Sequence, residues 1–147
     1  MSLQSRAVTM TKQMIQIEST DPGTYENAMA DWITTQLAPY PNVRLSRQEV
    51  LPGRPNLIAE LTGDPSLPAL VMICHMDTVV VGDGWTLPPF DAIEKDGKIY
   101  GRGACDMKSG LACCLSAFQY AAETHQTYGK KPKQTQKLIR SMDEEAI

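Results

Sequence analysis

The stretch Ala69-Leu70-Val71-Met72-Ile73-Cys74, followed at once by His75-Met76-Asp77, decides the fold of this 147-residue chain. An unbroken apolar run is typical of a strand buried on both faces, as in a parallel sheet covered by helices. We therefore expect a central strand over residues 69–74, parallel to its neighbours. Polar side chains suited to metal binding or proton transfer follow it directly, where open α/β sheets place their ligands.

Helical patterns precede this strand. Apolar residues recur three or four positions apart over residues 7–17 and again over residues 25–37, which predicts two helices. Asp21-Pro22-Gly23 lies between them and has turn chemistry. Two further strand patterns follow, a weak one over residues 43–45 and a clearer alternating one over residues 56–62.

After the strand, residues 79–103 are rich in glycine and proline and predict a long loop with a small hairpin at Asp96-Gly97. An apolar stripe over residues 107–118 predicts a third helix. Residues 130–137 are basic and polar and predict an exposed loop, and residues 138–142 predict a last short strand. Helices that alternate with buried strands favour an α/β fold, a three-layer αβα arrangement with a mixed, largely parallel central sheet.

Composition excludes several classes of protein. With 14 Lys and Arg against 17 Asp and Glu, the net charge of −3 lacks the basic footprint of a nucleic-acid binder. The apolar runs are too short to span a membrane, and the first 20 residues lack a signal-peptide core. The four cysteines include the adjacent Cys113 and Cys114 and form no Cys-x-x-Cys pair, which argues against a disulfide framework. We expect a cytoplasmic protein that binds neither nucleic acid nor membrane.

Three polar elements stand at the ends of predicted strands and helices. They are His75-x-Asp77, Asp106 within a glycine-rich run, and Asp143-Glu144-Glu145 after the last strand. Each alone has an ordinary explanation: a surface pair, a helix N-cap, and a solvated charge run. Their order and spacing together are more specific.

With Trp85, Pro89-Phe90 and the run from Asp96 to Lys108, these elements resemble a dizinc hydrolase family. That family includes acetylornithine deacetylase, succinyl-diaminopimelate desuccinylase, aminoacylase and related carboxypeptidases and dipeptidases. Ser19 and Asn56 also fall where the family carries similar residues. The resemblance spans nearly the whole chain.

The resemblance implies that His75 ligates one Zn²⁺ ion, that Glu145 ligates a second, and that Asp106 bridges both. It implies that Asp77 orients His75 and that Glu144 is the general base. A cis peptide bond after Asp106 is implied as well. Imidazole and carboxylate ligands suit Zn²⁺, with Co²⁺ as the other candidate. Two such ions polarise a carbonyl and activate water, whose proton the base passes to the leaving amine.

The implied activity is zinc-dependent hydrolysis of amide bonds in N-acyl amino acids or small peptides. Family members are longer, with a lid or dimerisation domain and two further metal ligands. We therefore expect residues 1–147 to form the N-terminal part of one catalytic domain, inactive in isolation and dimeric in a full-length form. The alternative is a catalytically silent remnant of the fold that acts as an interaction module.

The sequence departs from the family pattern in several places. Cys74 stands where a glycine often precedes the histidine, and Arg140-Ser141-Met142 is more polar than the usual strand before the acidic run. The chain's other histidine, His125, is interpreted as an exposed surface residue.

Overall fold

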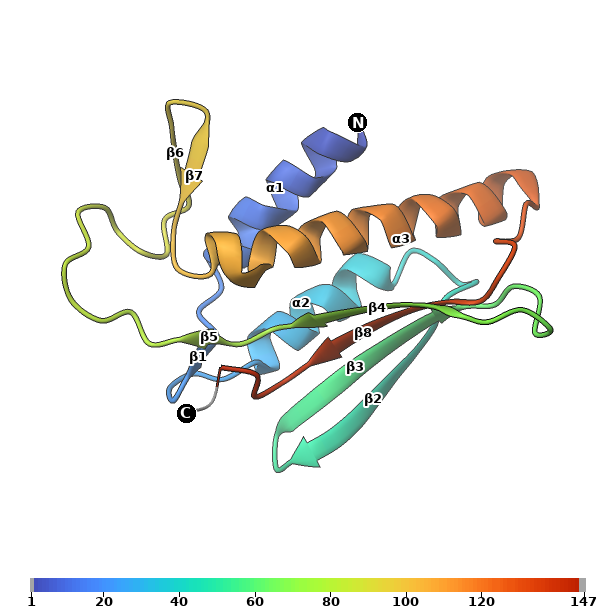
Figure 1. Ribbon diagram of the computed structural model, residues 1–147, viewed down its shortest axis with the longest axis horizontal. Coiled ribbons are helices and arrows are strands. Elements are labelled where there is room, and N and C mark those ends of the chain that lie inside the picture. The colour runs from blue at the N-terminus through green and yellow to red at the C-terminus, as the bar shows by residue number, and fades with distance from the viewer. Residues whose placement is uncertain (1, 146–147) are drawn as a thin grey trace.

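The apolar run forms a strand, β4 (Leu70–His75), in the computed structural model of the protein, which describes residues 2–145 (Figure 1). The preceding elements are α1 (Leu3–Ile15), β1 (Thr20–Asp21), α2 (Asn27–Leu37), β2 (Arg44–Leu51) and β3 (Arg54–Leu61). The following elements are β5 (Thr78–Val79), β6 (Ile93–Lys95), β7 (Lys98–Tyr100), an irregular turn (Ala104–Lys108), α3 (Ser109–Tyr128) and β8 (Gln136–Ser141). No helix of the described residues combines the length and the apolarity needed to cross a membrane.

The main sheet has four strands in the order β2-β3-β8-β4. The last strand, β8, lies between β3, to which it is antiparallel, and β4, to which it is parallel. The sheet is therefore mixed, as expected, although β2 and β3 also pair antiparallel and only one pairing is parallel. Because β4 and β8 run the same way, the residues that follow them meet at one edge of the sheet.

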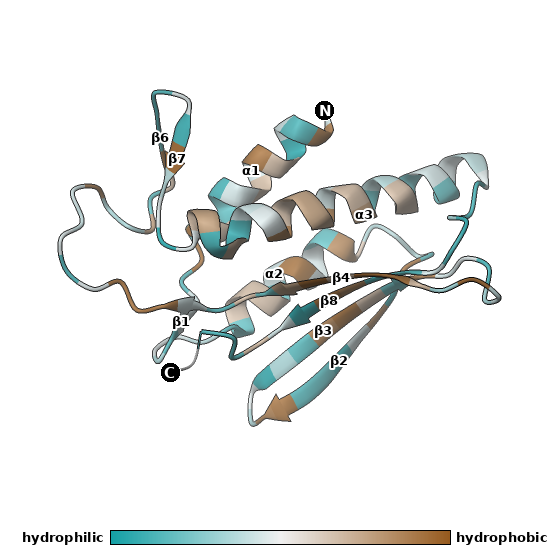
Figure 2. Ribbon diagram, viewed as in Figure 1, coloured by the Kyte–Doolittle hydropathy of each residue, from teal (hydrophilic) through white to brown (hydrophobic). Residues whose placement is uncertain are grey.

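The prediction that residues 69–74 form a central strand is wrong for the described part of the chain. β4 pairs with β8 on one side only and is an edge strand. Val71 is 45% exposed and Ile73 66% exposed, on the face that the helices leave open. Figure 2 shows β4 as a strongly apolar strand at this edge. The unbroken apolar run correctly predicted a strand that is parallel to its neighbour. Apolarity does not indicate which strands lie beside it.

One apolar core joins the helices to one face of the sheet. It includes Met14 of α1, Ile33 of α2 and Phe118 of α3, packed against Leu57 and Leu138 of the sheet. Figure 1 shows α1 and α3 side by side above the strands. The described residues thus supply one helical layer over the mixed α/β sheet.

Local sequence signals explain where several elements begin and end. Ser2 caps α1 by accepting a hydrogen bond from the Ser5 amide, and α3 ends at Gly129, whose φ of 66° is left-handed. The predicted hairpin is confirmed as β6 and β7, joined by Asp96 and Gly97 with φ of 52° and 70°. The strand expected over residues 43–45 corresponds to β2, which is longer than predicted. No recognisable sequence pattern predicted the short parallel pair β1 and β5.

Candidate metal centre

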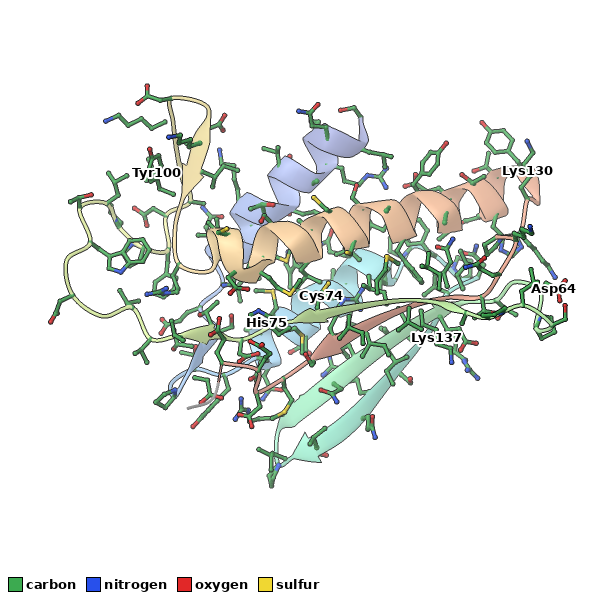
Figure 3. The ribbon with its side chains drawn as sticks, viewed as in Figure 1. Asp64, Cys74, His75, Tyr100, Lys130 and Lys137 are labelled. Atoms are coloured by element: carbon green, nitrogen blue, oxygen red, sulfur yellow. The ribbon has the colours of Figure 1, made fainter. Side chains whose placement is uncertain are left out.

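Three separate segments bring the candidate residues together at the carboxyl edge of β4 and β8. His75 ends β4, Asp106 lies in the turn before α3, and Glu144 and Glu145 follow β8. Nε2 of His75 lies 3.1 Å from a carboxylate oxygen of Asp106 and 3.8 Å from one of Glu144. Donor atoms of His75, Asp106 and Glu145 all lie within 4.8 Å of one another. Figure 3 shows His75 at the end of β4, far from Lys130 at the other end of the molecule.

The two nitrogens of the His75 ring have different surroundings. Nδ1 lies 3.0 Å from the backbone carbonyl oxygen of Asp77 and 3.7 Å from its carboxylate. Since a carbonyl oxygen can only accept, Nδ1 carries a proton and donates it there. Nε2, on the other side of the ring, is directed at the acidic cluster. This hydrogen bond from Nδ1 fixes the tautomer that presents Nε2 to a metal.

The acidic neighbours change the pKa of His75. The Asp77 carboxylate raises it, burial opposes this, and Asp106 raises it further, to about 9. In the absence of metal, His75 is therefore protonated at neutral pH and serves as the cation of the cluster. A metal ion that binds here must displace that proton.

Asp77 is almost fully buried beneath the imidazole. Burial alone would raise its pKa, but the neighbouring His75 imidazole and the amides of Glu145 and Glu144 outweigh this and lower it. One carboxylate oxygen accepts the Glu145 amide at 2.7 Å. The other oxygen has no hydrogen-bond partner within residues 2–145. Asp77 thus stays ionised and joins the end of β4 to the acidic run after β8.

Asp106 and Glu145 complete the donor set. The Asp106 side chain is 78% exposed, and the bond from Asp106 to Met107 is cis, as expected. Burial raises the pKa of Glu145, and the charges of Asp106, Glu144 and Asp77 raise it further against the opposing effect of His75. This concentration of negative charge around one imidazole favours a bound cation.

The donor set fits a metal ion. One imidazole nitrogen and carboxylate oxygens from two segments are ligands that Zn²⁺ and similar ions accept. The oxygen of Asp77 that lacks a partner fits a role as acceptor for a histidine ligand. A second acidic group, formed by Asp21, Glu26 and Asp77, is different, because the Arg54 guanidinium already pairs with Asp21 and Glu26.

Several polar residues support the loops of the site. Ser19 donates its hydroxyl proton to the Met76 carbonyl at 2.8 Å, and its own carbonyl accepts the Thr78 amide at 2.9 Å. Asn56 accepts the Met142 amide at 3.1 Å. Only the resemblance marked Ser19 and Asn56 in the sequence. No sequence pattern marked Arg54.

Lys108 is a second residue that sequence analysis missed. It is 1% exposed, and its ammonium donates to the Ile17 carbonyl at 2.7 Å. Burial lowers its pKa to about 8, against the opposing charge of Glu18. The bond joins the segment after α1 to the turn that carries Asp106. His125, interpreted as exposed, is half-buried, with Nδ1 3.3 Å from the Asn42 amide nitrogen.

Comparison with known proteins identifies a peptidase family. The profile of peptidase family M20/M25/M40 matches residues 71–147. A succinyl-diaminopimelate desuccinylase of Gluconacetobacter diazotrophicus is 47% identical over 74 residues, which cover 50% of this chain and 19% of that protein. The chain thus spans about a fifth of the length of that relative.

Solved structures agree with the fold. Human carnosine dipeptidase 1 matches with a TM-score of 0.75 and 27% identity, over 97% of this chain and 33% of that one. A Bacillus subtilis protein described as a dinuclear metal binding peptidase matches with a TM-score of 0.54 and 19% identity. That second match covers 94% of this chain and 34% of the other.

Proposed function

The chain belongs to peptidase family M20/M25/M40, and from that premise we propose that it carries the metal centre of a zinc-dependent amide hydrolase. The observation that carries the proposal is the meeting of His75, Asp106 and Glu145, from three segments, with donor atoms within 4.8 Å of one another. The proposed substrates are N-acyl amino acids or small peptides. Similarity to a desuccinylase and to a dipeptidase supports this class.

In this proposal His75, Asp106 and Glu145 would hold Zn²⁺ or Co²⁺, and Asp106 would be a ligand common to two ions. Asp77 holds the imidazole by accepting at Nδ1, so that Nε2 faces the ions. When bound, the ions polarise the amide carbonyl and make water acidic enough to lose a proton near neutral pH. The protein itself fixes the ligands and keeps Asp77 ionised.

Glu144 is the proposed general base. Its carboxylate lies 3.8 Å from Nε2 of His75, and its side chain is 60% exposed, so it is open to water and substrate. It takes the proton of the attacking water and delivers it to the departing amine nitrogen. Positioned proton transfer of this kind contributes about 10²–10⁴-fold to a rate.

We also propose that residues 1–147 are the N-terminal part of a larger catalytic unit. Within residues 2–145, the three ligand residues grouped at this site are fewer than two catalytic zinc ions require, since each ion usually keeps three protein ligands. The small share of each relative that the chain covers supports the same proposal. The chain assayed alone is then expected to bind zinc weakly and to be inactive.

The test uses this chain and the longest gene product that contains it. Both are loaded with Zn²⁺ or Co²⁺ and assayed against N-succinyl and N-acetyl amino acids and dipeptides. In the active form, Glu144→Gln is expected to lower kcat about 10²–10⁴-fold while the zinc content stays unchanged. Glu94→Gln is the matched control, because Glu94 forms an exposed ion pair with Lys12. A metal-loaded gene product that hydrolyses none of these substrates would instead support the catalytically silent alternative.

A further inference from the structure

Arg54 lies at the start of β3, outside the candidate metal centre. Its guanidinium is 12% exposed and contacts three carboxylates. Nε donates to Glu26 at 2.9 Å, and Nη2 donates to Asp21 at 2.5 Å and also to Glu26. Nη1 lies 2.8 Å from a carboxylate oxygen of Asp143. The guanidinium also stacks on Tyr25, 4.4 Å from the ring centroid.

The register of the sheet explains why Arg54 reaches Asp143. β3 and β8 are antiparallel, with Leu57 opposite Arg140. Three residues before Leu57 of β3 and three residues after Arg140 of β8, the same register brings Arg54 opposite Asp143. The first residue of β3 therefore lies beside the residue that precedes Glu144.

Asp143 is held both by its side chain and by its backbone. The side chain pairs with Arg54, and the amide donates at 3.3 Å to the same Glu26 oxygen that Arg54 contacts. Its φ of 63° lies in the left-handed region, which aspartate tolerates better than most residues. This bend sets the direction in which Glu144 and Glu145 leave β8.

We propose that Arg54 is a positioning residue, which holds the Asp143 bend so that Glu144 and Glu145 face His75. The inference rests on the proposed function, because it assigns Arg54 a role in the same site. Arg54 contacts neither the candidate ligands nor the candidate base. It acts through Asp143 and Glu26.

The number and shape of the contacts explain why this residue is arginine. A guanidinium offers five donors in a planar fork, which suits carboxylates on several sides at once. A lysine ammonium at this position keeps the charge but cannot span Glu26, Asp21 and Asp143 together. Glu26 is fully buried, so the contact most easily lost is the one to Asp143, whose side chain is 36% exposed.

The test compares Arg54→Lys and Asp143→Asn with the wild-type chain by calorimetric titration with Zn²⁺, well below the unfolding temperature of each variant. Each substitution is expected to weaken zinc binding about 10-fold, the usual scale for residues that orient metal ligands. The double variant should bind no more weakly than Arg54→Lys alone, since both changes remove one contact. Arg47→Lys is the matched control and should bind as the wild type does, because Arg47 pairs with Asp31 on the surface.

A second readout separates positioning from simple stability. In the active gene product, Arg54→Lys is expected to lower kcat more than it weakens zinc binding, with KM unchanged, because Glu144 is displaced too. If Arg54→Lys does not fold, Asp143→Asn still tests the inference, since it leaves the buried pair of Arg54 and Glu26 in place. If the folded variants bind zinc as tightly as the wild type does, the inference about Arg54 is overturned and the proposed function is not. A wild-type chain and gene product that bind no zinc would overturn the proposed function, and the inference with it.

Discussion

His75 lies among the charged groups of the site. Its Nδ1 donates to the Asp77 carbonyl, and its Nε2 lies against Asp106. Asp77, and then Asp106, raise the pKa of His75 to about 9 despite its burial. The same ring that would bind a metal therefore acts as a buried cation when no metal is bound.

The raised pKa of His75 makes the stability of the metal-free protein depend on pH. The pKa of His75 rises from an ordinary value of 6.5 when the chain folds, so the folded state holds its proton more tightly. The resulting stabilisation is fully present below pH 6.5 and is lost as the pH rises through about 9. A shift of this size corresponds to roughly 3 kcal/mol. We expect the free energy of unfolding of wild type to exceed that of His75→Gln by more at pH 6 than at pH 9.5.

Urea unfolding of both proteins with a chelator present measures this difference. The comparison with a variant is needed because burial lowers the pKa of Lys108 to about 8. Lys108 therefore titrates in the same pH range as His75, and its contribution to stability changes with pH in the opposite direction. That contribution is common to both proteins and cancels. A gap between wild type and His75→Gln that stays constant with pH would contradict the prediction.

At the scale of elements, Gly103 decides how the turn Ala104–Lys108 joins the loop before it. Its φ of 73° is left-handed, and an added Cβ would lie 2.6 Å from a methyl carbon of Thr78 and 3.2 Å from the Lys108 side chain. Glycine therefore allows both the backbone angle and the close approach of β5.

Gly103→Ala is expected to lower the free energy of unfolding by about 1–3 kcal/mol, the scale of a residue held in an unfavourable backbone region. Gly129→Ala separates the two causes, because Gly129 has a similar φ of 66° but open space around its Cβ position. Chemical denaturation of both variants gives the comparison. An equal loss in both would mean that crowding at Gly103 contributes nothing.

β8 carries an unusual residue in its core-facing row. Arg140 is 0% exposed, beside Cys74 in the parallel register, and its three side-chain nitrogens have no hydrogen-bond partner among residues 2–145. Burial lowers its pKa to about 9, with the Cys74 and Cys114 thiols as the opposing neighbours. A buried charge without a partner is costly.

Arg140→Met keeps the length of the side chain and removes the charge. We expect the variant to be more stable by about 1–4 kcal/mol, as seen when buried charges give way to apolar residues of similar volume. Arg44→Met is the control, since the Arg44 side chain is 77% exposed and should change stability little. Thermal and urea unfolding both report the result. A less stable Arg140→Met would indicate that the guanidinium has an anionic partner in solution.

The same elements show what the sequence could and could not predict. Apolar spacing located the helices, because burial of one face leaves a regular trace, and polar residues after Cys74 and Ser141 marked the site edge. Strand order left no such trace. β4 was expected at the centre of the sheet but lies at the edge of the described sheet. Its own residues do not indicate which strands pair with it. Arg54 was missed for the same reason: its role depends on a register between distant strands.

Across the whole molecule, the candidate ligands tie together segments that are far apart in the chain. His75 ends β4, Asp106 precedes α3, and Glu145 follows the last strand, β8. The acidic donors repel one another when no metal is bound, apart from the compensation that protonated His75 provides. A bound ion replaces that repulsion with bonds that exist only in the folded chain.

Zinc should therefore stabilise the fold as a unit. At a free concentration 100 times its dissociation constant, a ligand that binds only the folded state adds about 2.7 kcal/mol. For a chain of this size that corresponds to an increase in Tm of roughly 5–10 °C. We expect Zn²⁺ to raise the Tm of the purified chain by this amount, EDTA to reverse the increase, and His75→Ala to abolish it. His125→Ala should keep the full increase, because His125 lies at the end of α3 beside Asn42, away from the donor set. An equal zinc-dependent increase in wild type and His75→Ala would place the binding site elsewhere in the chain and contradict the ligand assignment.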